Sequence, residues 1–109
     1  MAAMIEPAGA EASTELVHVQ VAYVGELRGV MGVSRETLAV RCGISVWEFL
    51  LDFGRTHVRL RALLDQGRGI DRGEVVVFRN GLNIVHADHR HAHLAEGDKL
   101  VFGKPVGGG

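Results

Sequence analysis

The sequence predicts an α+β domain: a mixed, largely antiparallel sheet of about five strands with its helices on one face. Three observations lead to this prediction. Short β-branched segments stand near both ends of the chain, a capping motif starts a helix between them, and an Asn-Gly pair separates two later apolar segments. The 109 residues correspond to one domain, and a composition of 47 % hydrophobic and 23 % charged residues is typical of globular proteins.

The first two strands are predicted early in the chain. Residues 16–24 alternate between two sets of side chains with a period of two, which indicates a strand with at least one buried face. Residues 25–32 are expected to form a loop that anchors Leu27 and Val30 in the core. The β-compatible residues 36–41 follow closely enough to pair with the first strand as a hairpin.

A helix is predicted to start at a capping box. In this motif the Ser45 hydroxyl accepts the Glu48 amide, and the Glu48 carboxylate accepts the Ser45 amide. The apolar spacing that follows is helical, and we expect this main helix to end near Gly54. A second short helical segment is expected over residues 56–66, ending at Gly67.

The remaining strands are predicted over residues 74–79, 82–85 and 99–102. Asn80-Gly81 between the first two is a strong hairpin signal, because both central residues of a type I′ turn need positive φ. If the first and last strands both lie at the centre of the sheet, they must run parallel and be joined through the helix.

The two ends of the chain differ from this domain, which is predicted to span residues 16–102. Residues 1–15 are expected to be a mobile tail, with no secretion signal, so we expect a cytoplasmic protein. Residues 103–109 are expected to be a flexible tail that ends in three glycines. A glycine run loses backbone entropy on folding and packs nothing, so folding gives no reason for it.

The charge balance and the single cysteine exclude several classes of function. Twelve basic residues oppose 13 acidic ones, so no net field favours a nucleic acid or a membrane as a partner. Cys42 is the only cysteine, which excludes an internal disulfide and a CxxC pair, and we expect it to be a small buried residue.

Several motifs occur in a fixed order along the chain. They are Val19-x-Val21-x-Tyr23 leading into Leu27-Arg28, Ser45-Val46-x-x-x-Leu50, the Asn80-Gly81 pair, Leu94-x-x-Gly97-Asp98-x-Leu100 and Pro105-Val106-x-Gly108-Gly109. With them, residues 17–109 resemble the ubiquitin-like β-grasp sulfur carriers (MoaD/ThiS-like), the family of the molybdopterin synthase small subunit and the thiamine-pathway carrier. The resemblance implies a ubiquitin-like β-grasp fold.

The resemblance also implies a function for the C-terminal glycines. In that family an E1-like adenylating enzyme activates the terminal carboxylate with ATP, and the product is converted to a thiocarboxylate that delivers sulfur. Carried over, Gly109 would be the modified residue and Gly108 its partner in the double glycine. The protein would bind no cofactor itself. It would act as a cosubstrate, the small subunit of a sulfurtransferase such as molybdopterin synthase, rather than as a catalyst alone.

The rest of the tail would thread into a partner. Seven residues reach about 23 to 25 Å when extended, which is enough to enter the adenylating enzyme or a larger synthase subunit while the domain stays outside. Glycine suits a narrow channel because it has no Cβ, and a proline stiffens the root of the tail. The threading residues are Gly103, Lys104, Pro105, Val106 and Gly107.

A histidine-rich segment offers a rival function. If the segment is extended, alternate histidines project to one side, and with a neighbour they supply three or four ligands for Zn²⁺, Ni²⁺ or Cu²⁺. The spacing matches no established site, and a solvated loop without a metal is the preferred interpretation. The candidate ligands are His86, His89, His91 and His93.

Three alternatives therefore stay open beside a sulfur carrier for molybdopterin biosynthesis. The same tail could serve a thiamine-pathway carrier, or a ubiquitin-like modifier joined to lysines of other proteins. The third alternative is a metal-binding or purely structural β-grasp module. The molybdopterin pathway is preferred because the domain is long and has a second helical segment. An additional loop is expected over residues 67–73.

Overall fold

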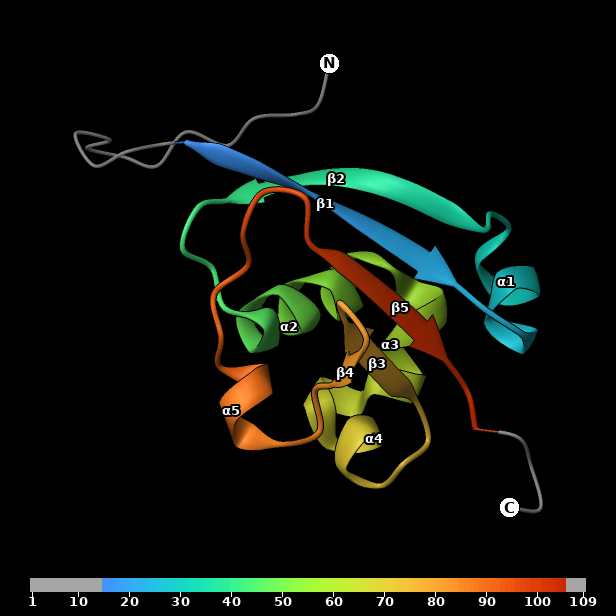
Figure 1. The fold of residues 1–109 in the computed structure, drawn as a ribbon. Coiled ribbons are helices and arrows are strands. Elements are labelled where there is room, and N and C mark those ends of the chain that lie inside the picture. The colour runs from blue at the N-terminus through green and yellow to red at the C-terminus, as the bar shows by residue number, and fades with distance from the viewer. Residues whose placement is uncertain (1–14, 106–109) are drawn as a thin grey trace.

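The computed structural model describes residues 15–105. The predicted tails, 1–15 and 103–109, lie outside this part of the chain except for residues 15 and 103–105. Its centre is a five-stranded sheet in the order β2-β1-β5-β3-β4, with α2 and α3 against one face (Figure 1). The predicted α+β class is confirmed. Among residues 15–105, no helix is long and apolar enough to cross a membrane.

The strand pairings follow the prediction. Strand β1 (Leu16–Tyr23) pairs antiparallel with β2 (Arg35–Arg41) and parallel with β5 (Lys99–Gly103). Strand β3 (Val76–Arg79) pairs antiparallel with β5 and with β4 (Leu82–Asn83). The first and last strands are therefore adjacent and parallel, as expected for a chain that crosses the sheet through its helices.

The expected loop over residues 25–32 is instead a short helix, α1 (Glu26–Met31). Glycines with positive φ stand on both sides of it, Gly25 at 61° and Gly32 at 79°, so the helix is limited to six residues. A helix this short has too few turns to show a periodic pattern in the sequence. Leu27, which lies on α1, is fully buried in the core, as the sequence predicts.

Helix α2 (Val46–Thr56) begins at the predicted capping box. The Glu48 amide donates to Ser45 Oγ at 3.0 Å, and the Ser45 amide donates to Glu48 Oε1 at 3.1 Å. The helix continues two residues past Gly54, near which it was predicted to end. Gly54 instead allows a neighbouring helix to approach: a Cβ there would lie 3.3 Å from Leu64 Cδ1.

The second predicted helix is broken into pieces. Helix α3 (Val58–Leu64) is followed by a 3-10 turn, η1 (Asp65–Gly67), and by α4 (Arg68–Asp71), where a loop was expected. Gly67 and Gly69 make this compact path possible. A Cβ on Gly67 would lie 2.2 Å from the Trp47 ring, and one on Gly69 would lie 1.7 Å from the Leu63 carbonyl oxygen.

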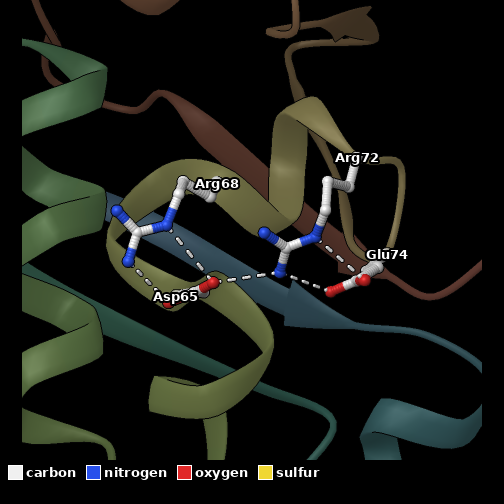
Figure 2. A network of polar contacts seen from close by, with 4 residues as sticks. All are labelled: Asp65, Arg68, Arg72 and Glu74. Atoms are coloured by element: carbon white, nitrogen blue, oxygen red, sulfur yellow. Dashed lines mark hydrogen bonds and ion pairs between the residues drawn. The ribbon is translucent and has the colours of Figure 1, made fainter.

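An exposed network of charged side chains joins these pieces (Figure 2). Arg72 lies between two carboxylates, with Nη2 3.0 Å from Asp65 Oδ2 and 2.9 Å from Glu74 Oε1. Arg68 also pairs with Asp65, at 3.1 Å. The two arginines hold the pKa of Asp65 below its ordinary value through their hydrogen bonds. This Asp65 network connects the end of α3 to the start of β3.

Helix α5 (Ala87–Arg90) packs near the start of α2 through one arginine. The Arg90 guanidinium lies 4.2 Å from the centroid of the Trp47 ring, close enough for a cation–π contact. It also donates to Asp71 and to the Val85 carbonyl oxygen, each at 2.6 Å. Arg90 therefore ties the histidine-rich segment to the helical layer.

The sheet has one buried face and one open face. Alternate residues of the central strands are buried against α2 and α3, and the Phe53 and Phe102 rings meet at 5.4 Å between centroids. Side chains of the opposite parity face away from the helices. Cys42, expected to be buried, is exposed just after β2. The fully buried strand residues are Val19, Val21, Tyr23, Val77, Leu100 and Phe102.

Candidate functional site

The candidate site is the place where the C-terminal tail leaves the domain. Of the predicted threading residues, Gly103, Lys104 and Pro105 belong to the described residues. Gly103 is the last residue of β5, so the ordered strand extends one residue further than the sequence predicts. Lys104 and Pro105 are exposed. The other predicted tail residues, Val106, Gly107, Gly108 and Gly109, lie outside the described residues.

A buried carboxylate fixes the start of β5. Asp98 is only 8 % exposed and accepts three hydrogen bonds: from Arg79 Nε at 3.0 Å, Asn80 Nδ2 at 3.0 Å and the Ala95 amide at 2.9 Å. Asn80 Oδ1 in turn accepts the Lys99 amide at 3.0 Å. This Asp98 cluster, made of Asp98, Arg79 and Asn80, joins the β3–β4 turn to the first residue of β5.

The charge of Asp98 is stabilised although the residue is buried. Burial alone would raise the pKa of this carboxyl, because it disfavours the charged form. The hydrogen bonds from Asn80, the Ala95 amide and Arg79 outweigh burial and hold the pKa below its ordinary value. The carboxylate is therefore ionised at neutral pH, with its partners satisfied.

The far end of β5 is fixed as well. The Val24 amide donates to the Phe102 carbonyl oxygen at 3.0 Å, which extends the pairing of β1 and β5 by one step. A Cβ on Gly103 would lie 2.9 Å from Val24 Cγ2, so glycine permits the close approach there. Lys104 Nζ then lies 3.3 Å from Glu26 Oε1 on α1. The tail consequently leaves from a strand that is held at both ends.

Sequence reasoning missed the Asp98 cluster as a part of the site. In the sequence, Gly97-Asp98 was only part of a motif, and Asn80 was only a hairpin residue with positive φ, which the structure confirms at 50°. A signal was present in the chain, because Asn80 and Asp98 lie in turns next to strands of the same predicted sheet. Only the register of β3 against β5 brings them together, with Arg79 opposite Leu100.

The open face of the sheet carries an apolar strip beside the tail. Val101 pairs with Ala22 on one side and with Phe78 on the other, and Val76 lies opposite Gly103. Phe78 is 37 % exposed, and the other side chains are half-buried. The register of β3 against β5 places Val76 and Phe78 on the open face.

The histidine-rich segment does not adopt the extended form that a metal site was expected to need. Residues 87–90 form α5, so the alternation that would align His89, His91 and His93 is lost. His86 and His89 approach edge to face, with ring centroids 6.4 Å apart. Across residues 15–105, no group of three or more His, Cys, Asp and Glu side chains is arranged to hold a metal ion.

A comparison with protein-family models identifies one match. The model described as the ThiS family matches residues 21–109, which is well over half of the chain. The match begins within β1 and includes the C-terminal glycines. No curated protein sequence matches the chain.

Solved structures share the fold at low sequence identity. Small archaeal modifier protein 1 from Methanosarcina acetivorans is 23 % identical, with a TM-score of 0.66 over 87 % of this chain and 99 % of its own. A putative molybdopterin converting factor subunit 1 from Pyrococcus furiosus is 22 % identical, with a TM-score of 0.65 over 83 % and 99 %. Urm1 from Trypanosoma brucei is 17 % identical, with a TM-score of 0.65 over 89 % and 100 %. These likenesses support the ubiquitin-like β-grasp fold.

Proposed function

Because the chain belongs to the ThiS family of ubiquitin-like sulfur carriers and modifiers, we propose that it carries sulfur as a thiocarboxylate on Gly109. The observation that supports this most is the match to the family over the glycine tail, combined with the rigid strand from which the tail departs. The domain then binds the partner enzymes, and the chemistry takes place on the backbone carboxyl group of Gly109.

The proposed reaction has two steps. The Gly109 carboxylate attacks the α-phosphorus of ATP, a C–O–P linkage forms, and pyrophosphate leaves. Hydrosulfide supplied by a sulfur donor then attacks the carbonyl carbon of Gly109. The bond to AMP breaks, AMP leaves, and a thiocarboxylate remains. No change of oxidation state is needed. The first step removes the negative charge of the carboxylate, which otherwise repels a nucleophile, and supplies a good leaving group.

The domain contributes position rather than catalysis. An acyl adenylate is hydrolysed if water reaches it, so the reacting carboxyl must enter a closed pocket of the partner. A tail that starts from a strand fixed at both ends enters such a pocket at lower entropic cost than one that starts from a loose segment. The proposed partners are an E1-like adenylating enzyme and a larger synthase subunit that accepts the sulfur. We propose that the reaction occurs in the cytoplasm, where ATP is available.

Molybdopterin biosynthesis is the pathway that we propose for this sulfur. The long domain with its additional helical segments supports the choice, and a putative molybdopterin converting factor subunit shares the fold at 22 % identity. Protein modification is the second candidate, supported by the likeness to a small archaeal modifier protein. Peptides from denatured cell extract in which Gly109 is joined to a lysine of another protein would favour modification over sulfur transfer.

The adenylation step can be tested by exchange of labelled pyrophosphate into ATP. We expect the full chain to support exchange with the E1-like enzyme of the same organism, and a chain lacking Gly108 and Gly109 to lose it. Cys42→Ser is the matched control, because this exposed thiol is the only one in the chain. Exchange that persists without the two glycines would contradict the proposal.

A further inference from the structure

A groove with basic side chains lies on the open face near the root of the tail. It has a volume of about 350 Å³ and runs over β1 between α1, the start of β2 and the start of β5. Backbone and small or polar side chains such as Gln20 and Ser34 form its floor. We call it the basic groove, and its charged lining consists of Arg28, Arg35 and Lys99.

These three cations differ from four arginines of the helical layer, whereas Arg59 and Arg61 of that layer donate to carbonyl oxygens. Arg55, Arg68, Arg72 and Arg90 each pair with a carboxylate. Within residues 15–105, the side chains lining the basic groove form no ion pair, and no acidic side chain lines it. Exposed cations without counter-charges raise the local potential and attract an anionic surface.

The basic groove is next to the exit of the tail. Val24 lines the groove, and the same residue donates to the Phe102 carbonyl oxygen and contacts the position of Gly103. Ala22 also lines it and belongs to the apolar strip through its pairing with Val101. A partner that receives the tail from β5 and covers the strip therefore reaches Arg28, Arg35 and Lys99 as well.

We propose that the basic groove binds acidic side chains that the adenylating enzyme carries beside the opening of its pocket. This inference rests on the proposed function, since it assigns the surface through which the same partner is recognised. Carboxylates fit three separate cations that come from three elements, because each can pair with its own acidic side chain at the rim of an apolar contact. Such pairs steer association and fix orientation more than they increase affinity.

A nucleic acid fits the basic groove less well. Binding of single strands usually combines cations with aromatic rings on which bases stack. The aromatic residue that lines the groove, Tyr23, is 1 % exposed, and its hydroxyl donates to Glu36 Oε2 at 2.8 Å on the core side. The net charge of the chain is also −1, so no general field supports such binding.

Two residues of one strand provide a matched test. Arg35 and Arg41 are the first and last residues of β2, are both exposed, and share the open face, but only Arg35 lines the groove. Binding of the full chain to the E1-like enzyme of the same organism would be measured for the wild type, Arg35→Glu, Arg41→Glu and the triple variant Arg28→Glu/Arg35→Glu/Lys99→Glu. Each would be measured at about 50 mM and about 300 mM NaCl, where charge screening differs strongly.

We expect the triple variant to raise Kd about tenfold or more at low salt, Arg35→Glu to raise it several-fold, and Arg41→Glu to change it by less than about twofold. The higher salt should weaken the wild type and leave the triple variant nearly unchanged. Equal affinities of Arg35→Glu and Arg41→Glu would overturn the inference. The inference would also be overturned if the triple variant kept wild-type affinity for the enzyme but lost self-association or binding to a single-stranded RNA.

The pyrophosphate exchange separates this inference from the proposed function. Saturating enzyme should restore exchange in the triple variant, because its tail is intact. A wild-type chain that binds the enzyme with the expected salt dependence but supports no exchange would contradict the function and leave the basic groove standing. If the wild type supports exchange but the groove variants bind the enzyme as tightly as the wild type, the proposed function stands and the inference about the basic groove is contradicted.

Discussion

Two clusters of charged side chains in this protein have the same chemistry but different surroundings. The carboxylate of the Asp98 cluster is buried at the start of β5, whereas the Asp65 network lies exposed over α4 (Figure 2). A buried carboxylate leaves its partners unsatisfied when it is lost, while an exposed one is replaced by water. The comparison teaches that burial decides which cluster stabilises the fold, and the buried one fixes the strand that carries the tail.

The largest expected effect comes from packing beside the exposed network. Gly69→Ala puts a Cβ 1.7 Å from the Leu63 carbonyl oxygen, so the backbone of α4 must move. We expect the free energy of unfolding in urea to fall by about 4 kcal/mol or more, since overlap with backbone cannot be relieved by a rotamer change. Gly29→Ala on α1 is the control, because nothing lies within 4 Å of its Cβ. A mild effect at Gly69 would mean that α4 is packed less closely than described.

The next effect concerns the buried cluster. Asp98→Ala removes the acceptor of Arg79, Asn80 and the Ala95 amide, and we expect the free energy of unfolding to fall by about 2 to 3 kcal/mol. Urea denaturation at neutral pH measures this change. A loss no greater than that of Asp65→Ala would break the comparison.

The two clusters should also differ in acid. The folded pKa of Asp98 lies below its unfolded value, so the stability it contributes is complete above an unfolded pKa of about 3.9 and is lost as the pH falls through the folded pKa. Asp98→Asn should therefore lose less stability than the wild type between about pH 5 and pH 2. Asp65→Asn should show the same effect to a smaller extent, because the pKa of Asp65 is also lowered but water screens its pairs with Arg68 and Arg72. Urea titrations over this range provide the test, and parallel curves for all three proteins would contradict it.

The smallest effect is expected at the centre of the exposed network. Arg72→Ala breaks two ion pairs, with Asp65 and with Glu74, but both carboxylates remain in water. We expect no resolvable change in the midpoint of thermal unfolding. A clear fall in the midpoint would show that the network, rather than the packing of Gly69, holds α4 in place.

The sequence was sufficient for the parts of the fold with strong local signals. The capping box of α2, the Asn80-Gly81 turn and the parallel pairing of β1 with β5 are all present. Two glycines interpreted as helix ends also have packing roles. Gly54 lies inside α2, where a Cβ would press against Leu64, and Gly67 does end η1, with φ at 93°, but also lies against the Trp47 ring.

The candidate site divides in the same way. The chemical group, the Gly109 carboxyl, was predicted from composition and resemblance, because a run of three glycines stands out in a sequence. The surfaces around the tail were not predicted, because the Asp98 cluster and the basic groove each combine residues from separate elements. Arg28, Arg35 and Lys99 lie far apart in the sequence, and the strand register together with the position of α1 brings them to one groove.

The central claim is that Gly109 carries the sulfur, and intact mass spectrometry tests it most directly. The full chain and Cys42→Ser would each be incubated with the E1-like enzyme, ATP and a sulfur donor. Both should gain the mass difference of one oxygen replaced by one sulfur atom, and fragmentation should locate the gain on Gly109. A gain that disappears in Cys42→Ser, or no gain in either protein while pyrophosphate exchange proceeds, would contradict the account.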